Sequence, residues 1–192
     1  MSTVLTDEEL IEEIRDGSQA AMEVLVKRHY SDVYSYLYRK IGNRHTAYDL
    51  TQEVFIKMMQ SLGNYRDKGK FRHWLLKIAV NHCYDYYRSK QYRHRHAHTE
   101  LEVDMPDENS NVWDLFHCHY QQEQAKQAVL SLPEKQRDAI ILNFYHDLKI
   151  REIAEMTDTS ESTIKYRIKA GISKLKQILL AGGEGSDHRK QG

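Results

Sequence analysis

Between residues 71 and 90 the sequence carries five polar side chains at helical spacing, and together they offer the chemistry of nucleic-acid binding. The stretch has no glycine or proline, and its apolar residues recur at steps of three and four, which predicts a helix. At about 100° per residue, one side presents a set that we name the donor stripe: His73, Lys77, Asn81, Tyr84 and Arg88. Cations suit phosphates, amide and imidazole groups suit base edges, and an aromatic ring suits base stacking. The alternative is an ordinary amphipathic helix with a solvated polar face.

The opposite side of this helix is apolar and predicts burial. It consists of Phe71, Trp74, Leu75, Ile78, His82 and Tyr86. Cys83 lies toward the same side, which favours a buried structural thiol over a redox switch. With Cys118 as the only other cysteine, no disulfide framework is expected.

Charge is distributed along the chain in blocks, although 28 basic and 28 acidic residues cancel overall. Residues 64–98 hold nine lysines and arginines against two acids, a net charge of +7, while residues 6–24 and 99–114 each carry −6. Blocks of opposite sign indicate separate surfaces for separate partners.

Composition favours an all-α protein of two small helical domains. Glycine and proline are scarce, alternating β-branched runs are absent, and no apolar run approaches the roughly 20 residues that cross a membrane. The N-terminus is acidic and lacks the pattern of a signal peptide, so we expect a cytoplasmic protein without membrane insertion.

The first domain is predicted to span residues 1–95 and to contain four helices. Thr6-Asp-Glu-Glu9 reads as a capping box that opens the first, and Gly42 as the C-terminal cap of a second helix over residues 19–41. A third helix is expected over 46–61, followed by a basic loop over 63–70 and the helix that carries the donor stripe. The third helix has two classes of residue: apolar Leu50, Val54, Ile56 and Met58, and polar Asp49, Gln52, Glu53 and Lys57.

A flexible acidic linker is predicted over residues 96–112, where hydrophobicity is low and periodicity is absent. The second domain is expected over residues 113–180, with a disordered tail over 181–192. Its four helices are predicted at 113–130, 133–145, 149–156 and 160–179, with Pro133 suited to a first helical turn.

The end of the second domain has the layout of a helix-turn-helix. A short helix over residues 150–156 is followed by a polar turn and by a helix that Ser160 can cap. Because a recognition helix enters the major groove with its N-terminal residues on base edges, we assign two groups of contacts. Bases are assigned to Ser162, Thr163, Tyr166 and Lys169, and phosphates to Lys165 and Arg167. A helical hairpin with a basic outer face is the alternative.

Four segments in this order resemble bacterial RNA polymerase sigma factors, in particular the small two-domain extracytoplasmic-function group. The third helix, Ala47-Tyr-Asp-Leu-Thr-Gln-Glu-Val-Phe55, is similar to the family's polymerase-binding segment. The pattern of Phe71, Trp74-Leu75, Ile78-Ala79, Asn81, Asp85 and Arg88 is similar to its −10 helix. Leu132-Pro-Glu-Lys-Gln-Arg137 and the helix-turn-helix are similar to its −35 domain.

The resemblance implies a non-enzymatic subunit, with no cofactor or metal, that directs core RNA polymerase to promoter DNA. The clamp helices of the largest polymerase subunit would be contacted by Asp49, Gln52, Glu53 and Phe55. The −10 element would be read and melted by Tyr65, Lys68, Lys70, Arg72 and the donor stripe. The second domain would read the −35 duplex, and an anti-sigma factor is an expected partner.

Other readings of the same residues are weaker. The histidine clusters over 94–98 and 117–119 lack four-ligand zinc spacing. Asp49 and Glu53 lack a partner histidine in the sequence pattern for catalysis, so an interaction surface is favoured. Many relatives carry Arg-Ala where this chain has Ala170-Gly171, so one DNA contact is expected to be missing, with Lys169 or Lys174 as substitutes. A stand-alone helix-turn-helix regulator that binds DNA without polymerase is the alternative function.

Overall fold

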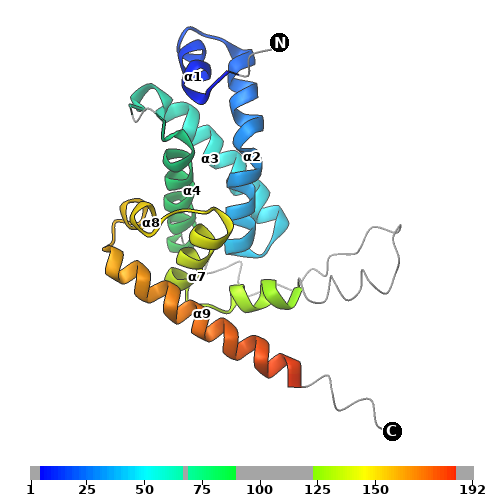
Figure 1. The fold of residues 1–192 in the computed structure, drawn as a ribbon. Coiled ribbons are helices and arrows are strands. Elements are labelled where there is room, and N and C mark those ends of the chain that lie inside the picture. Colours follow the sequence, from blue (N-terminus) through cyan, green and yellow to red (C-terminus); the bar gives the residue numbers. More distant parts are fainter. Residues whose placement is uncertain (1–4, 67–68, 90–122, 185–192) are drawn as a thin grey trace. The chain divides into compact units, whose positions relative to one another are not determined.

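The computed structural model describes residues 5–66, 69–89 and 123–184, and every regular element within these ranges is helical (Figure 1). The all-α prediction is therefore confirmed for the described residues. The chain divides into two compact units, the first formed mainly by residues 1–99 and the second mainly by residues 100–192, and each is described by itself below. Several predicted features lie outside the described residues: the linker, both histidine clusters, Lys68, Cys118 and residues 185–192.

The first unit begins with α1, which spans Asp7–Arg15. The predicted capping box is confirmed, since the Glu9 amide donates to the Thr6 hydroxyl over 3.2 Å and the Thr6 amide donates to the Glu9 carboxylate over 2.6 Å. The hydrogen bond from the Thr6 amide lowers the pKa of Glu9, because it stabilises the ionised carboxylate. Three acids in the first turn also suit the positive end of the helix dipole.

The second helix, α2, spans Gln19–Ile41, as predicted. Gly17, at φ +95°, turns the chain out of α1, and the Ser18 side chain accepts from the Ala21 amide to start α2. Gly42 ends the helix at φ +82°, a left-handed conformation that glycine adopts without strain.

The third helix, α3, spans Arg44–Ser61 and begins slightly before the predicted residue 46, because Asn43 caps it by accepting from the Thr46 amide over 2.8 Å. A short 3₁₀ turn, η1, follows at Leu62–Asn64, and α4 spans Phe71–Arg88. In Figure 1, α2, α3 and α4 lie against one another, and α1 lies near the N-terminal end of α2.

The core of the first unit is formed by one face of each helix. On α4 it includes the predicted Phe71, Leu75 and His82, together with Cys83, whose thiol is buried as expected. On α3 the buried residues are Ala47, Leu50, Thr51, Val54, Phe55 and Met58. Ile56, expected among the apolar residues of the third helix, is 48% exposed, because the buried stripe runs through Val54, Phe55 and Met58 instead.

In the second unit, residues 123–130 are helical and are followed by α7 at Glu134–Ile140, the π-helical turn η3 at Ile141–Tyr145, and α8 at Ile150–Met156. The predicted single helix over 133–145 is thus an α-helix whose last turn widens. Arg137 holds the preceding turn, since its guanidinium donates to the carbonyl oxygens of Leu130 and Leu132.

The last helix, α9, spans Glu161–Glu184 and extends past the predicted end at residue 179. The glycines at 182 and 183 therefore do not stop it at the predicted position. A glycine in a helix costs only about 1 kcal/mol relative to alanine, so it weakens a helix without forbidding it. None of the helices within the described ranges combines the length and apolar character that a membrane span requires.

Gly171 lies at the contact between α7 and α9 and is buried. A Cβ atom added there would stand 2.9 Å from Cγ1 of Ile140 and 3.2 Å from its Cδ1. Gly171 therefore faces the interior of the unit. The expectation that one DNA contact is missing concerns Ala170, where many relatives carry Arg, and it stays a prediction.

We predict that Gly171→Ala destabilises the second unit. Overpacking a core costs about 1–3 kcal/mol, while replacing a helical glycine by alanine returns about 1 kcal/mol, so a net loss of about 1 kcal/mol is expected. Hydrogen exchange of α7 and α9 amides under increasing urea measures it. Gly63→Ala is the matched control, because an added Cβ meets no atom within 4 Å there. Unchanged or slower exchange in Gly171→Ala would contradict the packing argument.

Candidate polymerase and nucleic-acid interfaces

The exposed polar face of α3 carries three of the four residues expected to bind polymerase. Asp49, Gln52 and Glu53 are all exposed, and all three line an open groove between α3 and α4. The α4 side of the groove is formed by His82, Asp85, Tyr86 and the C-cap residue Ser89. The structure thus brings the acids of one helix beside titratable groups of the next.

Glu53 is held in this groove by His82. The Nε2 atom of the buried His82 ring lies 2.7 Å from the Glu53 carboxylate. Burial lowers the pKa of His82 and the charge of Lys57 lowers it further, which outweighs the opposing effects of Glu53 and Asp85. Because Nδ1 is also buried without a hydrogen-bond partner, a proton there would be costly. At neutral pH the ring is therefore neutral and donates to Glu53 through Nε2.

Phe55, the fourth residue of the expected polymerase contact, is only 5% exposed. Its ring is stacked on Tyr30 at a centroid distance of 6.1 Å, and Tyr30, Tyr34 and Tyr38 continue the stack along α2 at 6.0–6.1 Å. This corrects the expectation of a direct Phe55 contact. The ring instead packs α3 against α2 and so sets the orientation of the exposed residues around it.

Three large hydrophobic residues of α3, none of them expected at an interface, are exposed beside the polar ones. Tyr48, Ile56 and Met59 are 53%, 48% and 44% exposed. Burial raises the pKa of Tyr30, and nearby Tyr48 and Tyr34 add to this, while a hydrogen bond with Gln52 opposes it. Tyr48 and Gln52 therefore lie near the same Tyr30 hydroxyl. The sequence did contain a signal for this surface, because Tyr48, Ile56 and Met59 are spaced with Gln52 at steps of three and four residues, as on one side of a helix.

The donor stripe lies along the outer side of α4, as the spacing predicted. Lys77, Asn81 and Arg88 are exposed, and His73 and Tyr84 are half-buried. Lys70, expected with them at the −10 element, is exposed at the N-cap position of α4. A positively charged, solvent-accessible stripe therefore exists in the first unit, on a different helix from Asp49 and Glu53.

Tyr84 owes its position to a buried cation. The side chain of Lys40 is fully buried, and its Nζ lies 5.5 Å from the centroid of the Tyr84 ring and 5.4 Å from that of Tyr87. The Tyr87 hydroxyl also donates to the Lys40 carbonyl over 3.2 Å. Cation–π attraction thus fixes Tyr84 from beneath and leaves part of it at the surface.

Tyr65, expected to stack on a base, is instead part of an aromatic cluster. It is 5% exposed, and its ring centroid lies 5.6 Å from that of Phe71 and 5.1 Å from that of Trp74. Phe71 and Trp74 are 5.6 Å apart. A ring in this setting cannot offer a free face to a base, so the stacking role assigned to Tyr65 is corrected to a structural one. Trp74, predicted to favour the core, is half-buried in the same cluster.

Arg72 is also less available than expected for the −10 element. Its Nε lies 2.6 Å from the Asp32 carboxylate and its Nη2 lies 3.3 Å from the other oxygen. Such a two-point pair fixes the guanidinium and offsets its charge. Arg72 therefore ties the first turn of α4 to α2.

In the second unit the recognition helix has the predicted cap. The Ser160 hydroxyl accepts from the Thr163 amide over 3.2 Å and lies 2.9 Å from the Ser162 hydroxyl and 2.8 Å from that of Thr163. The preceding turn contains Asp158 at φ +50°, and the Thr159 amide donates to the carbonyl of Ala154. The three hydroxyls at the start of α9 thus form one small network.

The remaining residues assigned to DNA lie on the accessible side of α9. Tyr166 is 69% exposed, Lys165 and Lys169 are exposed, and Arg167 is half-buried. Ile164 is buried on the opposite side. The helix therefore presents cations and a tyrosine outward from its N-terminal half, as a helix that enters a major groove requires.

We predict that His82 titrates below its ordinary pKa of about 6.5. Between pH 6.5 and the lowered value the unfolded chain binds a proton that folded His82 refuses, so its contribution to stability is present above pH 6.5 and lost as pH falls through that window. An NMR titration of the His82 ring gives the midpoint. His82→Gln, which can still donate to Glu53, should make urea unfolding less dependent on pH over this range. A midpoint above 6.5 would show that pairing with Glu53 outweighs burial.

Comparison with known proteins places these features in a family. The model of sigma-70 region 2 matches residues 25–93, and that of sigma-70 region 4 matches residues 122–175. These ranges contain α3 with α4 and the helix-turn-helix, respectively.

Curated relatives match over most of this chain. It is 31% identical over 179 residues to the ECF RNA polymerase sigma-E factor of Escherichia coli, with 88% of this chain and 91% of the relative covered. It is 34% identical over 166 residues to the ECF RNA polymerase sigma factor SigE of Mycolicibacterium smegmatis, with 85% of this chain covered but only 64% of that longer relative.

A solved structure shows a similar fold. The sigma factor RpoE of Bartonella quintana, determined in complex with the anti-sigma factor NepR, matches with a TM-score of 0.65 at 19% identity, over 82% of this chain and 95% of that one. With both region models matched in order and a full-length relative above 30% identity, the chain belongs to the ECF group of the sigma-70 family of RNA polymerase sigma factors.

Proposed function

We propose that this chain binds core RNA polymerase and directs it to promoters by reading a −10 element with its first unit and a −35 element with its second. One observation carries the proposal. Within the first unit, the exposed acids of α3 and the exposed cations of α4 lie on different helices of one packed body, so protein and DNA can be bound by the same unit.

The polymerase surface that we propose consists of Asp49, Gln52 and Glu53, with Tyr48, Ile56 and Met59 beside them. Exposed apolar residues next to charged ones suit a protein partner, since apolar area supplies affinity while charge supplies orientation and rate. The negative charge of the acids is complementary to basic side chains, and we propose that these lie on the clamp helices of the largest polymerase subunit. His82 keeps Glu53 in place for that contact.

The −10 surface that we propose runs along α4 and comprises Lys70 and the donor stripe. Taking a base out of the stack costs a few kcal/mol, and stacking on a side chain returns about 1–3 kcal/mol. With Tyr65 in the aromatic cluster, the half-buried Tyr84 is the main remaining ring for this role. Lys70, Lys77 and Arg88 would hold the phosphates, so that binding energy alone drives the opening and no chemical reaction is involved.

The −35 surface that we propose is the accessible side of α9. Tyr166 and Lys169 would reach base edges together with Ser162 and Thr163, while Lys165 and Arg167 would bind phosphates. The Ser160 network holds the two hydroxyl residues in one arrangement at the helix start. Each phosphate contact should steepen the dependence of log binding constant on log salt concentration by about 0.9.

An anti-sigma factor is the second protein partner that we propose, since the structurally similar Bartonella sigma factor was determined in complex with one. As a subunit of the transcription machinery the chain would act in the cytoplasm. The alternative, a stand-alone regulator, would not explain why the first unit matches sigma-70 region 2.

The function is tested by run-off transcription with core RNA polymerase on a pool of genomic promoter fragments. We expect new, discrete start sites that depend on this chain, and alignment of the DNA upstream of them should reveal shared −10 and −35 sequences. Absence of new starts, together with absence of co-migration with core polymerase, would overturn the proposal. Tight and specific duplex binding by the chain alone would then support the stand-alone regulator.

Charge reversal of the α3 acids should separate polymerase binding from folding. Asp49→Lys with Glu53→Lys is expected to weaken binding to core polymerase by more than 100-fold, because two attractive contacts become repulsive. Surface plasmon resonance with immobilised core polymerase measures the loss.

The matched control is Glu12→Lys with Glu13→Lys, which changes net charge equally at exposed positions of α1. It should bind core polymerase like the unchanged chain. Glu53→Lys would place a cation beside His82 and could disturb the fold, so a milder double variant, Asp49→Asn with Glu53→Gln, is measured as well. It should bind core polymerase more weakly than the unchanged chain and unfold at the same midpoint. Equal binding by all three variants would remove this face from the interface.

A further inference from the structure

We propose that Glu8 and Arg15 of α1 are positioning residues that fix the segment between α3 and α4 for −10 recognition. The inference rests on the proposed function and extends it to a helix that neither the sequence analysis nor the proposed DNA surfaces assign to promoter reading. It concerns the described residues on either side of positions 67 and 68, namely Tyr65 and Arg66 before them and Gly69 and Lys70 after them, which we name the loop flanks.

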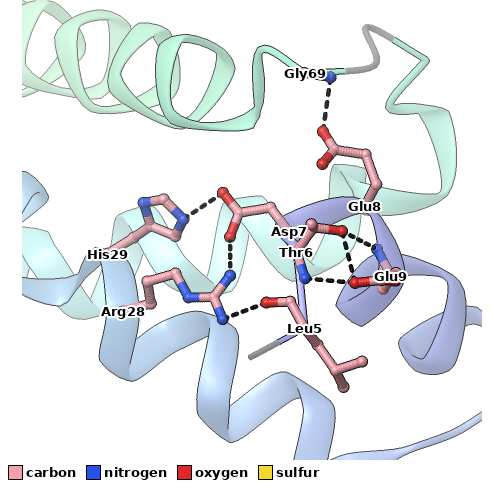
Figure 2. A network of polar contacts seen from close by, with 8 residues as sticks. All are labelled: Leu5, Thr6, Asp7, Glu8, Glu9, Arg28, His29 and Gly69. Carbon is pink, nitrogen blue, oxygen red and sulfur yellow. Dashed lines mark hydrogen bonds and ion pairs between the residues drawn. The ribbon is translucent and has the colours of Figure 1, made fainter. Parts of the chain in front are cut away.

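The flank formed by Gly69 and Lys70 is held by Glu8. The Gly69 amide donates to the Glu8 carboxylate over 2.6 Å, a contact between residues 61 positions apart (Figure 2). Gly69 has φ +76°, a conformation that other residues rarely adopt. The glycine lets the backbone point its N–H toward α1, and the carboxylate supplies the acceptor. Lys70, the next residue, is the exposed N-cap of α4.

The flank formed by Tyr65 and Arg66 is held by Arg15. Its Nη2 donates to the Tyr65 carbonyl over 2.7 Å, and the same carbonyl accepts from Nη1 of Arg66 over 2.9 Å. Arg66 also donates to the Gly63 carbonyl over 2.7 Å. The Tyr65 ring is fixed separately in the aromatic cluster. One residue from each end of α1 therefore binds one flank.

The helix that carries both contacts is itself anchored. One oxygen of Asp7 lies 2.6 Å from Nη1 of Arg28 and the other lies 2.8 Å from Nε2 of His29, while Arg28 also donates to the Leu5 carbonyl over 2.7 Å (Figure 2). His29 is buried, and its ring meets the edge of Phe71 at a centroid distance of 5.1 Å. Asp7 thus joins α1 to α2 at the side chain that packs on the first residue of α4.

This arrangement gives α1 a mechanical role. Both loop flanks contact α1, and the first residue of α4 is joined to α1 through His29 and Asp7. Lys70 and the start of the donor stripe are therefore held in a fixed relation to the flank before them. Without the two contacts the backbone of the flanks would have more freedom before DNA binds, and the cost of ordering it would be subtracted from the binding free energy. The loss should appear where bases leave the duplex, since that step costs a few kcal/mol that binding must supply.

The experiment uses complete holoenzyme on a promoter identified by run-off transcription. Three variants are compared with the unchanged chain: Glu8→Ala, Glu8→Gln and Arg15→Ala. Glu13→Ala is the matched control, because it removes the same charge from an exposed position of the same helix. Permanganate reactivity of thymines gives the rate and extent of −10 opening, and the affinities for core polymerase and for duplex promoter are measured in parallel.

We expect Glu8→Ala and Arg15→Ala each to slow −10 opening by about three- to tenfold, the effect of losing one hydrogen bond to a charged group at a part-exposed site. Glu8→Gln, which keeps an acceptor oxygen, should retain most of the rate, and Glu13→Ala should retain all of it. Affinity for core polymerase should stay unchanged in every variant. Hydrogen exchange of the Gly69 amide should quicken in Glu8→Ala only.

Two outcomes would overturn the inference. If Glu8→Ala opens promoters as fast as Glu13→Ala, α1 does not position the flanks. If slower opening is accompanied by a lower unfolding midpoint and weaker polymerase binding, the contacts only stabilise the fold. Both outcomes can be observed only if the unchanged chain directs transcription from discrete start sites. They are therefore distinct from failure of the proposed function itself.

Discussion

The first unit depends on the mutual burial of α2, α3 and α4. Each helix has one buried face, and burying it fixes which residues remain outside. On α3 the inward stripe through Leu50, Val54 and Met58 leaves Asp49 and Glu53 at the surface. On α4 the inward residues Leu75 and Ala79 leave Lys77 and Asn81 outside. The two proposed interfaces are thus consequences of one packing arrangement, because a helix turned to improve its core would also move its surface.

Buried polar groups refine the positions of exposed ones. His82 is neutral and buried, and it donates to Glu53 at the surface. Lys40 is fully buried and attracts the rings of Tyr84 and Tyr87. Such groups are costly to bury unless they are paired. Two of their partners, Glu53 and Tyr84, belong to the proposed binding surfaces, which links the packing of the interior to the geometry that a polymerase or a DNA strand would meet.

In the second unit, too, packing between helices determines which residues remain at the surface. Gly171 allows α9 to approach Ile140 of α7 closely, and Arg137 closes the turn before α7. Ser160 caps α9 and gathers the hydroxyls of Ser162 and Thr163. Close packing at the middle of α9 and capping at its start together set which way Tyr166 and Lys165 face. A recognition helix needs both, since its register on DNA is a matter of orientation as much as of sequence.

The sequence by itself determined the elements and their polarity. Caps at Thr6, Gly42 and Ser160, helical spacing on α4, and the order of family-like segments were readable because they are local properties of neighbouring residues. The burial of His82 and Cys83 was also predictable, since it follows from periodicity. The exposure of Asp49 and Glu53 could be predicted in the same way, since both lie on the polar side of one helix.

Only the tertiary structure decided which residues near an interface reach the surface. Phe55 and Tyr65 belong to motifs of the proposed binding segments, yet each packs against aromatic rings of another helix. Arg72 is paired with Asp32, 40 positions away. The contact of Glu8 with Gly69 has no local signal at all. Pairings of this kind depend on how helices meet, which a periodic pattern along one helix does not specify.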